Sequence, residues 1–239
     1  MKMSIRRSFG RLAAPLLAAL VATVSPADAQ SDELDRLHSA ALVLEEIMNA
    51  PDGGIPPTIR DAAAGLVVFP STIKGAFVVG AQRGKGVITA RDPETGQWSP
   101  PAFLTLTGGS FGFQIGGQAT DVVLVIMNER GVENMMSNTF TLGGEAAVSA
   151  GPVGREAEAS TDYAMRAQIL GYSRSRGLFA GLSLEGSTIR ADRDANEAIY
   201  GVGYNTGQIV LEQMGGTPDA VGEFLTAVRE EIGGAPVSE

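Results

Sequence analysis

Basic side chains beside glycines are the residues of this chain best suited to binding chemistry. Lys74, Arg83 and Lys85 bracket one predicted hairpin, and each stands next to a glycine. Arg174 and Arg176 flank a second predicted turn. Guanidinium groups pair with phosphate in a bidentate manner, and backbone N–H groups at glycine-rich turns form anion-binding nests. The grouping indicates a phosphate-bearing ligand, and the alternative is that these charges occupy turns only for solubility.

The segment Gly108–Gly112 fits the G-x-S-x-G pattern of a hydrolase nucleophile, with Ser110 in the serine position. That pattern requires a strand–turn–helix context, followed by an acid and then a histidine. The one histidine, His38, precedes the serine, and a predicted strand continues after Ser110. A Ser–Asp–His triad in this order is therefore excluded, and a Ser–Lys dyad with Lys74 or Lys85 is the arrangement that remains. Glycines that bend a strand explain the segment better, and we expect no enzyme and no catalytic residues.

Metal chemistry lacks its usual ligands in this chain. With one histidine and no cysteine, zinc and redox metals have no preferred donor set. A carboxylate site for calcium is left open, but no D-x-[DN]-x-[DN]-G loop is present. The nearest acidic group, Asp192-Arg193-Asp194, is better suited to begin a helix toward Tyr200. We expect neither a metal nor a cofactor.

Residues 1–29 are typical of an export signal. A basic segment precedes the apolar stretch Leu12 to Val24, and Ala27-Asp28-Ala29 matches an A-x-A cleavage site. The apolar stretch is too short to span a bilayer. We expect cleavage near Ala29 after Sec or twin-arginine export, and a periplasmic or secreted bacterial protein. Because the chain has no cysteine, we expect neither a lipoprotein anchor nor disulfides.

The charge balance restricts the possible partners. Removing residues 1–29 takes away four basic residues and one acidic residue, which lowers the formal net charge from −9 to −12. Nucleic acid is not expected as a partner, because phosphate backbones require a basic footprint. A membrane surface stays possible only where a local basic patch or apolar contacts meet it.

The mature chain is expected to be one domain, residues 55–239, preceded by an N-terminal helix within residues 30–54. That helix would be capped by Ser31, and its apolar stripe from Leu34 to Met48 predicts packing on its own domain; a membrane-surface or partner-binding helix is the alternative. A final helix is expected after Thr217, with Pro218 at its first position. Short β-type runs lie between them: Leu66–Phe69, Ala76–Val79, Val87–Thr89, Phe111–Gly116, Val122–Met127, Tyr163–Ile169 and Leu178–Leu184. We predict an α+β fold, a curved antiparallel sheet or partly closed β-barrel with amphipathic helices at both ends.

An ordered set of short motifs between about Ile55 and Leu211 resembles the SYLF domain, a lipid-binding and actin-regulator domain. The motifs are Ile55-Pro56-Pro57, Lys74-Gly75-Ala76-Phe77, Arg83-Gly84-Lys85-Gly86-Val87, Trp98-Ser99-Pro100-Pro101, Gly112-Phe113-Gln114-Ile115-Gly116, Thr120–Val125, Gly151-Pro152 and Ser175–Gly181. The resemblance implies phospholipid binding through basic residues near the start of the domain, which match Lys74, Arg83 and Lys85. Eukaryotic members bind phosphoinositides and some bind actin, but an exported bacterial member is expected to meet neither.

The resulting hypothesis is a lipid-binding protein of the bacterial envelope. A headgroup would lie against Lys74, Arg83 and Lys85, with Arg174 and Arg176 as further basic candidates. The acyl chains would follow a glycine-lined face near four aromatic residues, Phe77, Trp98, Phe111 and Phe113. The alternative is an envelope structural or protein-interaction module without a lipid ligand.

Overall fold

A computed structural model describes residues 26–50, 54–76, 80–110, 116–137, 139–144, 148–153, 167–175, 178–181, 184 and 186–234. For residues 26–29, 73–76, 80–81, 109–110, 116–118, 175 and 178–181 it describes the backbone alone.

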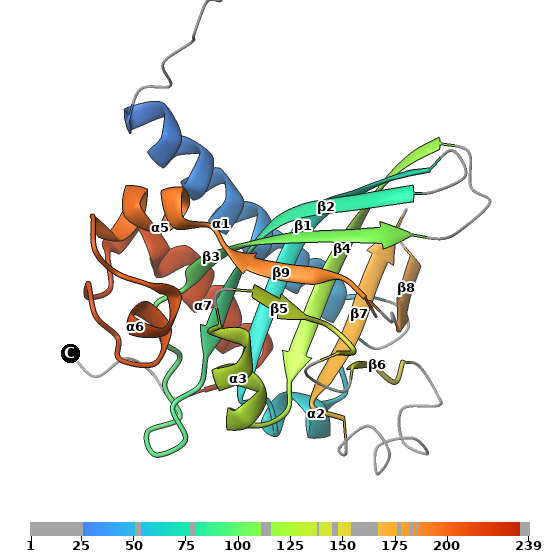
Figure 1. Cartoon of the computed structure of the whole chain (residues 1–239). Helices are drawn as coiled ribbons and strands as arrows, with labels where there is room; N and C mark the ends of the chain where they lie inside the picture. Colours follow the sequence, from blue (N-terminus) through green and yellow to red (C-terminus); the bar gives the residue numbers. More distant parts are fainter. Residues whose placement is uncertain are drawn as a thin grey trace, which may run out of the picture.

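The described strands form one curled, nine-stranded sheet (Figure 1). The strands are β1 (Gly65–Ala76), β2 (Gly80–Ala90), β3 (Ala102–Ser110), β4 (Gly116–Ile126), β5 (Thr139–Thr141), β6 (Val148–Ala150), β7 (Ile169–Ser175), β8 (Leu178–Gly181) and β9 (Thr188–Ala191). Their order is β5-β9-β3-β2-β1-β4-β7-β6, and β8 pairs with β7. Every pairing is antiparallel except that of β6 with β7. The predicted α+β class is confirmed, and the parallel pair is an addition to it.

Helices pack against both sides of this sheet (Figure 1). They are α1 (Pro26–Met48), α2 (Pro57–Asp61), α3 (Glu129–Met135), α5 (Arg193–Tyr200), α6 (Thr206–Val210), the 3₁₀ turn η2 (Asp219–Val221) and α7 (Gly222–Glu231). Helix α1 packs against α7, α5, β1 and β2, which confirms that the N-terminal helix docks on its own domain (Figure 1). In the described residues no helix combines the length and the apolar character needed to cross a membrane.

Two predicted helix boundaries were wrong. Helix α1 begins at Pro26 rather than after Ser31, because proline is well tolerated in a first turn and the next residues favour a helix. The last α-helix begins at Gly222, since Pro218 precedes the 3₁₀ turn η2 instead of the first α-helical turn. The apolar face expected for that helix is nevertheless buried, from Val221 to Val228.

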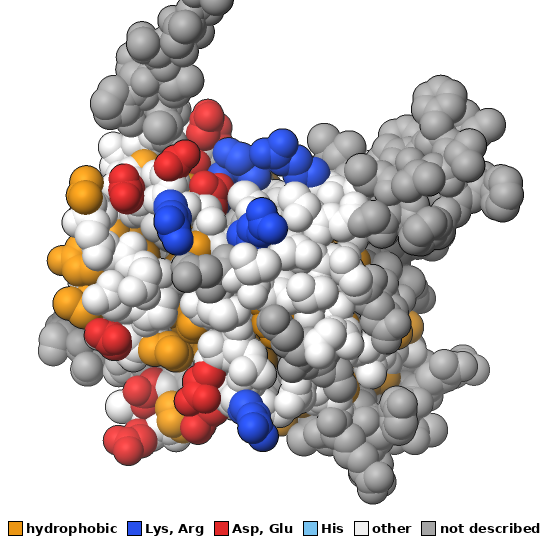
Figure 2. All heavy atoms as spheres, in the orientation of Figure 1, with side chains coloured by type: hydrophobic (Ala, Val, Ile, Leu, Met, Phe, Trp, Pro, Cys, Tyr) orange, Lys and Arg blue, Asp and Glu red, His pale blue; other side chains and the backbone are white. Residues whose placement is uncertain are grey.

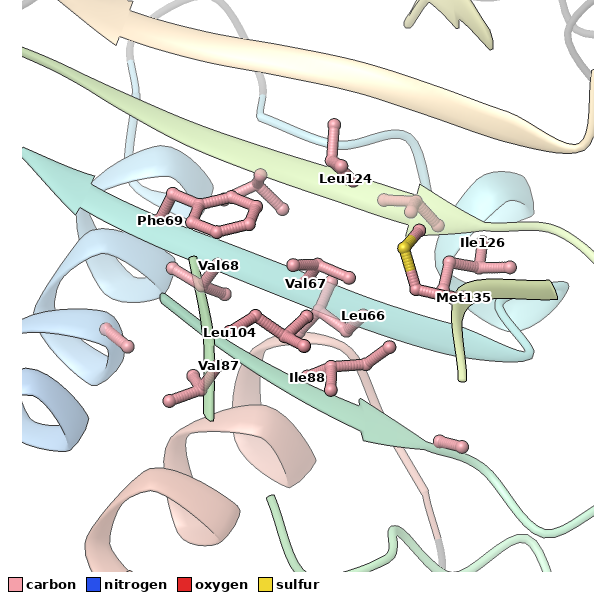
Figure 3. Close-up of a cluster of buried hydrophobic side chains, with 14 of the residues drawn as sticks. Leu66, Val67, Val68, Phe69, Val87, Ile88, Leu104, Leu124, Ile126 and Met135 are labelled. Carbon is pink, nitrogen blue, oxygen red and sulfur yellow. The ribbon is translucent and has the colours of Figure 1, made fainter. Parts of the chain in front are cut away.

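The core fills both sides of β1 and β4. The run from Val122 to Ile126 is completely buried, as expected for a strand with an apolar side chain at every position. Figure 3 shows side chains from β1, β2, β3, β4 and α3 packed together, Met135 of α3 among them. This packing fixes the strands that carry the exposed residues discussed below.

Glycines on the inner side of β2 make room for side chains of β1. A Cβ at Gly86 would lie 2.3 Å from the Val68 carbonyl oxygen and 2.4 Å from the Phe69 ring. A Cβ at Gly84 would lie 2.6 Å from Thr72 Oγ1. At these two positions the bare face is therefore occupied by the protein's own side chains.

Candidate anion-binding face

Strand pairing shows which residues of β2 and β3 share the face of the sheet that packs on α1. Val87 stands opposite Phe103, and the guanidinium of Arg36 in α1 lies over the Phe103 ring, 5.2 Å from its centroid. Alternate residues of a strand share a face. Lys85, two residues before Val87, and Thr105, two residues after Phe103, therefore lie on the same outer face, beyond the edge of α1.

Two rows of polar residues cross this outer face over β2, β3, β9 and β5. One row is Lys85, Thr105, Arg190, Thr139, and the other is Arg83, Thr107, Thr188, Thr141. Adjacent strands lie about 4.8 Å apart, so Lys85 and Arg190 flank Thr105 at a backbone separation of about 10 Å. We call Arg83, Lys85 and Arg190, with Thr105 and Thr107 between them, the basic face. Figure 2 shows Lys and Arg side chains gathered in the upper part of the molecule.

The three cations of the basic face are exposed and form no ion pair with a carboxylate in the described part of the chain. The ion pairs found there involve other basic residues, Arg36 and Arg174. In a chain with a formal net charge of −9, this leaves a local surface whose positive charge is not neutralised by a direct contact. Together with threonine hydroxyls, which donate and accept hydrogen bonds, it can hold a phosphate group.

Arg174 lies apart from the basic face. It stands opposite Asp121 on β4 and forms an ion pair with Glu46 of α1. Three strand steps separate β7 from β2 in the sheet. Arg174 therefore links β7 to the C-terminal part of α1 through Glu46, and Asp121 stands opposite it on the neighbouring strand.

Lys74 is on β1, in a different row from its predicted neighbours. The backbone register pairs Lys74 with Gln82, whereas Ile73 stands opposite Arg83. The side chain of Lys74 lies outside the described residues, as do Arg176, Phe77, Phe111 and Phe113.

Trp98 is a core residue at the other end of the sheet. Its side chain is 5% exposed, and its indole Nε1 donates a hydrogen bond to the Gly233 carbonyl oxygen at 2.5 Å. Trp98 forms an isolated antiparallel β-bridge with Arg91, which follows the end of β2. The eight residue steps from Arg83 to Arg91 span about 26 Å along the strand. The structure does not bring Trp98 to the basic face.

A buried charge cluster borders the basic face and was missed in the sequence. Arg36 lies 2.7 Å from the Glu33 carboxylate and 3.0 Å from Asp192, the residue before α5. Burial raises the pKa of Glu33 above its usual value, while the positive charges of Arg36 and Lys85 act in the opposite direction and Asp192 adds to the rise. In the sequence, the apolar stripe leaves Glu33 and Arg36 on the polar side of the helix, and only their i,i+3 spacing indicates a pair.

Arg190 was also missed, although the alternation Thr188-Ile189-Arg190 could have indicated a strand with Ile189 turned inward. Ile189 is buried and Arg190 is exposed, as that pattern requires. What the pattern does not contain is the pairing of β9 with β3, which places Arg190 near Lys85.

The described residues provide little for the hydrolase alternative. Ser110 is the last residue of β3 and stands opposite Gly80, so its backbone is not the strand–turn–helix elbow. His38 Nδ1 lies within hydrogen-bond distance, 2.7 Å, of Glu223 Oε1 on α7. The described residues also contain no group of three or more His, Cys, Asp or Glu side chains able to hold a metal ion.

Comparison with known proteins gives a consistent set of relatives. The family model described as "Ysc84: Las17-binding protein actin regulator" matches residues 107–231. The chain is 39% identical to "SH3 domain-containing YSC84-like protein 1" of Xenopus laevis over 170 residues, 69% of this chain and 50% of the relative. It is 38% identical to the Homo sapiens protein of that name over 167 residues, 67% and 48% of the two chains. Identity to "Protein YSC84" of Saccharomyces cerevisiae is 39% over 153 residues, 63% and 32%. The chain spans half or less of the length of these relatives.

Proposed function

The chain belongs to the Ysc84 family of SYLF-domain proteins, and we propose that it is a non-catalytic module that binds phospholipid or another lipid of the bacterial cell envelope. The observation that carries the proposal is the basic face, where Arg83, Lys85 and Arg190 stand exposed without direct counter-charges. The family is described by binding rather than by a reaction, which agrees with a binding role.

The chemistry of the basic face suits a lipid headgroup. Arginine offers two parallel N–H donors to a phosphate, and lysine adds a point charge. Thr105 and Thr107 lie between these cations and supply hydroxyl donors at the same surface. A sheet face that projects beyond α1 is accessible to a surface as large as a bilayer, whereas a buried site would not be.

The place of action follows from the predicted export signal in residues 1–29. A periplasmic or secreted protein meets envelope phospholipids, and actin is not an expected partner there. The matched region covers half or less of each relative, so the partners of those longer proteins do not transfer with it.

The proposal is tested by co-sedimentation of residues 30–239 with vesicles of phosphatidylcholine alone or with phosphatidylglycerol added. A basic residue near an anionic surface contributes about 1 kcal/mol, so Arg83→Glu, Lys85→Glu and Arg190→Glu combined should weaken binding by at least about a hundredfold. The matched control reverses three other arginines, Arg130→Glu, Arg193→Glu and Arg229→Glu, and should have a much smaller effect. A separate Lys74→Glu variant tests the residue whose side chain is not described.

Binding that survives in the basic-face variant would contradict the site but not the lipid. If no vesicle is bound under any salt condition, the proposal fails. The second candidate, a protein-interaction module without lipid, would then take its place. A family description that names a bound protein, Las17, favours this candidate over a hydrolase.

A further inference from the structure

A groove lies at the far end of β2, between the turn that joins β2 to β3 and helix α3. Two contiguous cavities of about 250 and 500 Å³ form it, and both are lined by Ala64, Arg91, Asp92, Pro93 and Glu129. Figure 2 shows acidic and hydrophobic side chains together at the lower left of the molecule, in the region of α3. We call this hollow the acidic groove.

Carboxylates surround the acidic groove. They are Asp61, Asp92, Glu94, Glu129 and Glu133. Hydrogen bonds from Thr95 and Glu94 lower the pKa of Asp92 and keep it ionised. Glu129 and Glu133 are exposed and form no ion pair with a described residue. An occupant must therefore bring positive charge.

The basic residue that lines the groove, Arg91, does not neutralise these carboxylates. Its guanidinium donates to the Asp61 carbonyl oxygen at 3.2 Å and lies over the Trp98 ring at 5.9 Å from the centroid. The guanidinium of Arg91 therefore contacts a backbone carbonyl and an aromatic ring, and not the carboxylates of the groove. The negative charge of the rim remains available to a ligand.

Apolar side chains distinguish the groove from a simple cation site. Its lining includes Val132 and Val210, which belong to the core, and Leu211, which is 47% exposed at the end of α6. An inorganic cation or a polyamine would leave the exposed side chain of Leu211 in contact with water. A peptide can cover it with one side chain while its lysine or arginine side chains reach the rim. An α-helix with side chains is about 10–12 Å across, which favours an extended segment in cavities of this size.

We propose that the acidic groove binds an extended peptide segment of a partner protein, one that carries lysine or arginine together with at least one leucine-like side chain. The groove lies at the opposite end of β2 from the basic face, so this interaction is separate from lipid binding. It would let one domain hold a lipid surface and a protein at the same time.

The test uses the protein as purified from the cells that express the full chain. Its binding to a fluorescein-labelled octapeptide of alternating lysine and leucine is measured by fluorescence anisotropy. Glu129→Lys with Glu133→Lys should weaken binding about tenfold or more, because both carboxylates change sign at the contact. The matched control, Asp219→Lys with Glu230→Lys, changes the net charge by the same amount at exposed sites outside the groove. Leu211→Ser should weaken binding about threefold or more without changing the charge.

Three results would overturn the proposal. The wild-type protein could fail to bind the octapeptide, or the groove and control variants could lose affinity equally, which would indicate attraction to net charge alone. The third is equal binding of an octapeptide with serine in place of leucine, together with full competition by spermine. That outcome would make the groove a small-cation site.

Discussion

Gly86 on β2 occupies a position where no side chain fits. A methyl group there would meet the Val68 carbonyl oxygen and the Phe69 ring at less than 2.5 Å, and neither can move without disturbing the sheet. We expect Gly86→Ala to lower the free energy of unfolding by about 2–3 kcal/mol, measured by urea denaturation. Gly222→Ala is the control, because Gly222 has a helical φ of −60° and open space around its Cβ. That change should raise stability by about 0.5 kcal/mol. Equal effects would contradict the close packing.

Glu33 provides a test of the buried charge cluster through pH. Its folded pKa is raised above the usual 4.5 by burial, so the folded state holds this proton more tightly than the unfolded state. The stabilisation by the protonated form is complete below pH 4.5 and is lost as the pH rises through the folded pKa. Glu33→Gln keeps the shape but does not titrate, so its unfolding free energy should lack this decline. Urea denaturation between pH 4 and about 7 measures it. Parallel pH profiles of the two proteins would show that Glu33 is not perturbed.

Docking of α1 on the sheet is an element-level claim that two leucines can test. Leu44 is 0% exposed, whereas Leu42 on the same helix is 43% exposed. Leu44→Ala should cost about 2–5 kcal/mol of unfolding free energy, because it leaves a cavity between α1 and its neighbours. Leu42→Ala should change stability by less than about 0.5 kcal/mol. If both variants were as stable as the wild type, the helix would not be part of the folded unit.

Elements were predictable from the sequence where one local pattern determines them. The unbroken apolar run of β4 predicted a buried strand, and this was confirmed. The stripe of α1 was confirmed for Leu37 and Leu44, but its first residue, Leu34, is 37% exposed. The capping box of α6, formed by Asn205 and Gln208, was missed because a glycine-rich stretch hid it. The burial of Glu33 and Arg36 could not be predicted, since it depends on Asp192, which lies 156 residues from Arg36 in the sequence. The same holds for the approach of Arg190 to Lys85, which only sheet pairing creates.

In the whole molecule, charge is separated along β2. The basic face lies at the first half of the strand and the acidic groove beyond its last residue, about 20–26 Å away. This distance exceeds the Debye length of about 8 Å at physiological salt. An anionic surface that attracts Arg83 and Lys85 is therefore screened from the carboxylates of the groove. With the proposed lipid-binding role, this strongly acidic chain would approach an anionic surface with the basic face first.

This separation predicts the orientation of the protein on an anionic vesicle. The chain has no cysteine, so Thr139→Cys on β5 and Glu94→Cys in the turn after β2 each create a single labelling site. Both positions are exposed. An environment-sensitive fluorophore at position 139 should shift to the blue and be quenched by brominated lipid when phosphatidylglycerol vesicles are added, because it borders the basic face. The same fluorophore at position 94 should change little, since it would point away from the bilayer. Salt should weaken the first signal, as expected for exposed charges. A larger response at position 94 than at 139 would reverse the orientation and contradict the assignment of the basic face to the lipid.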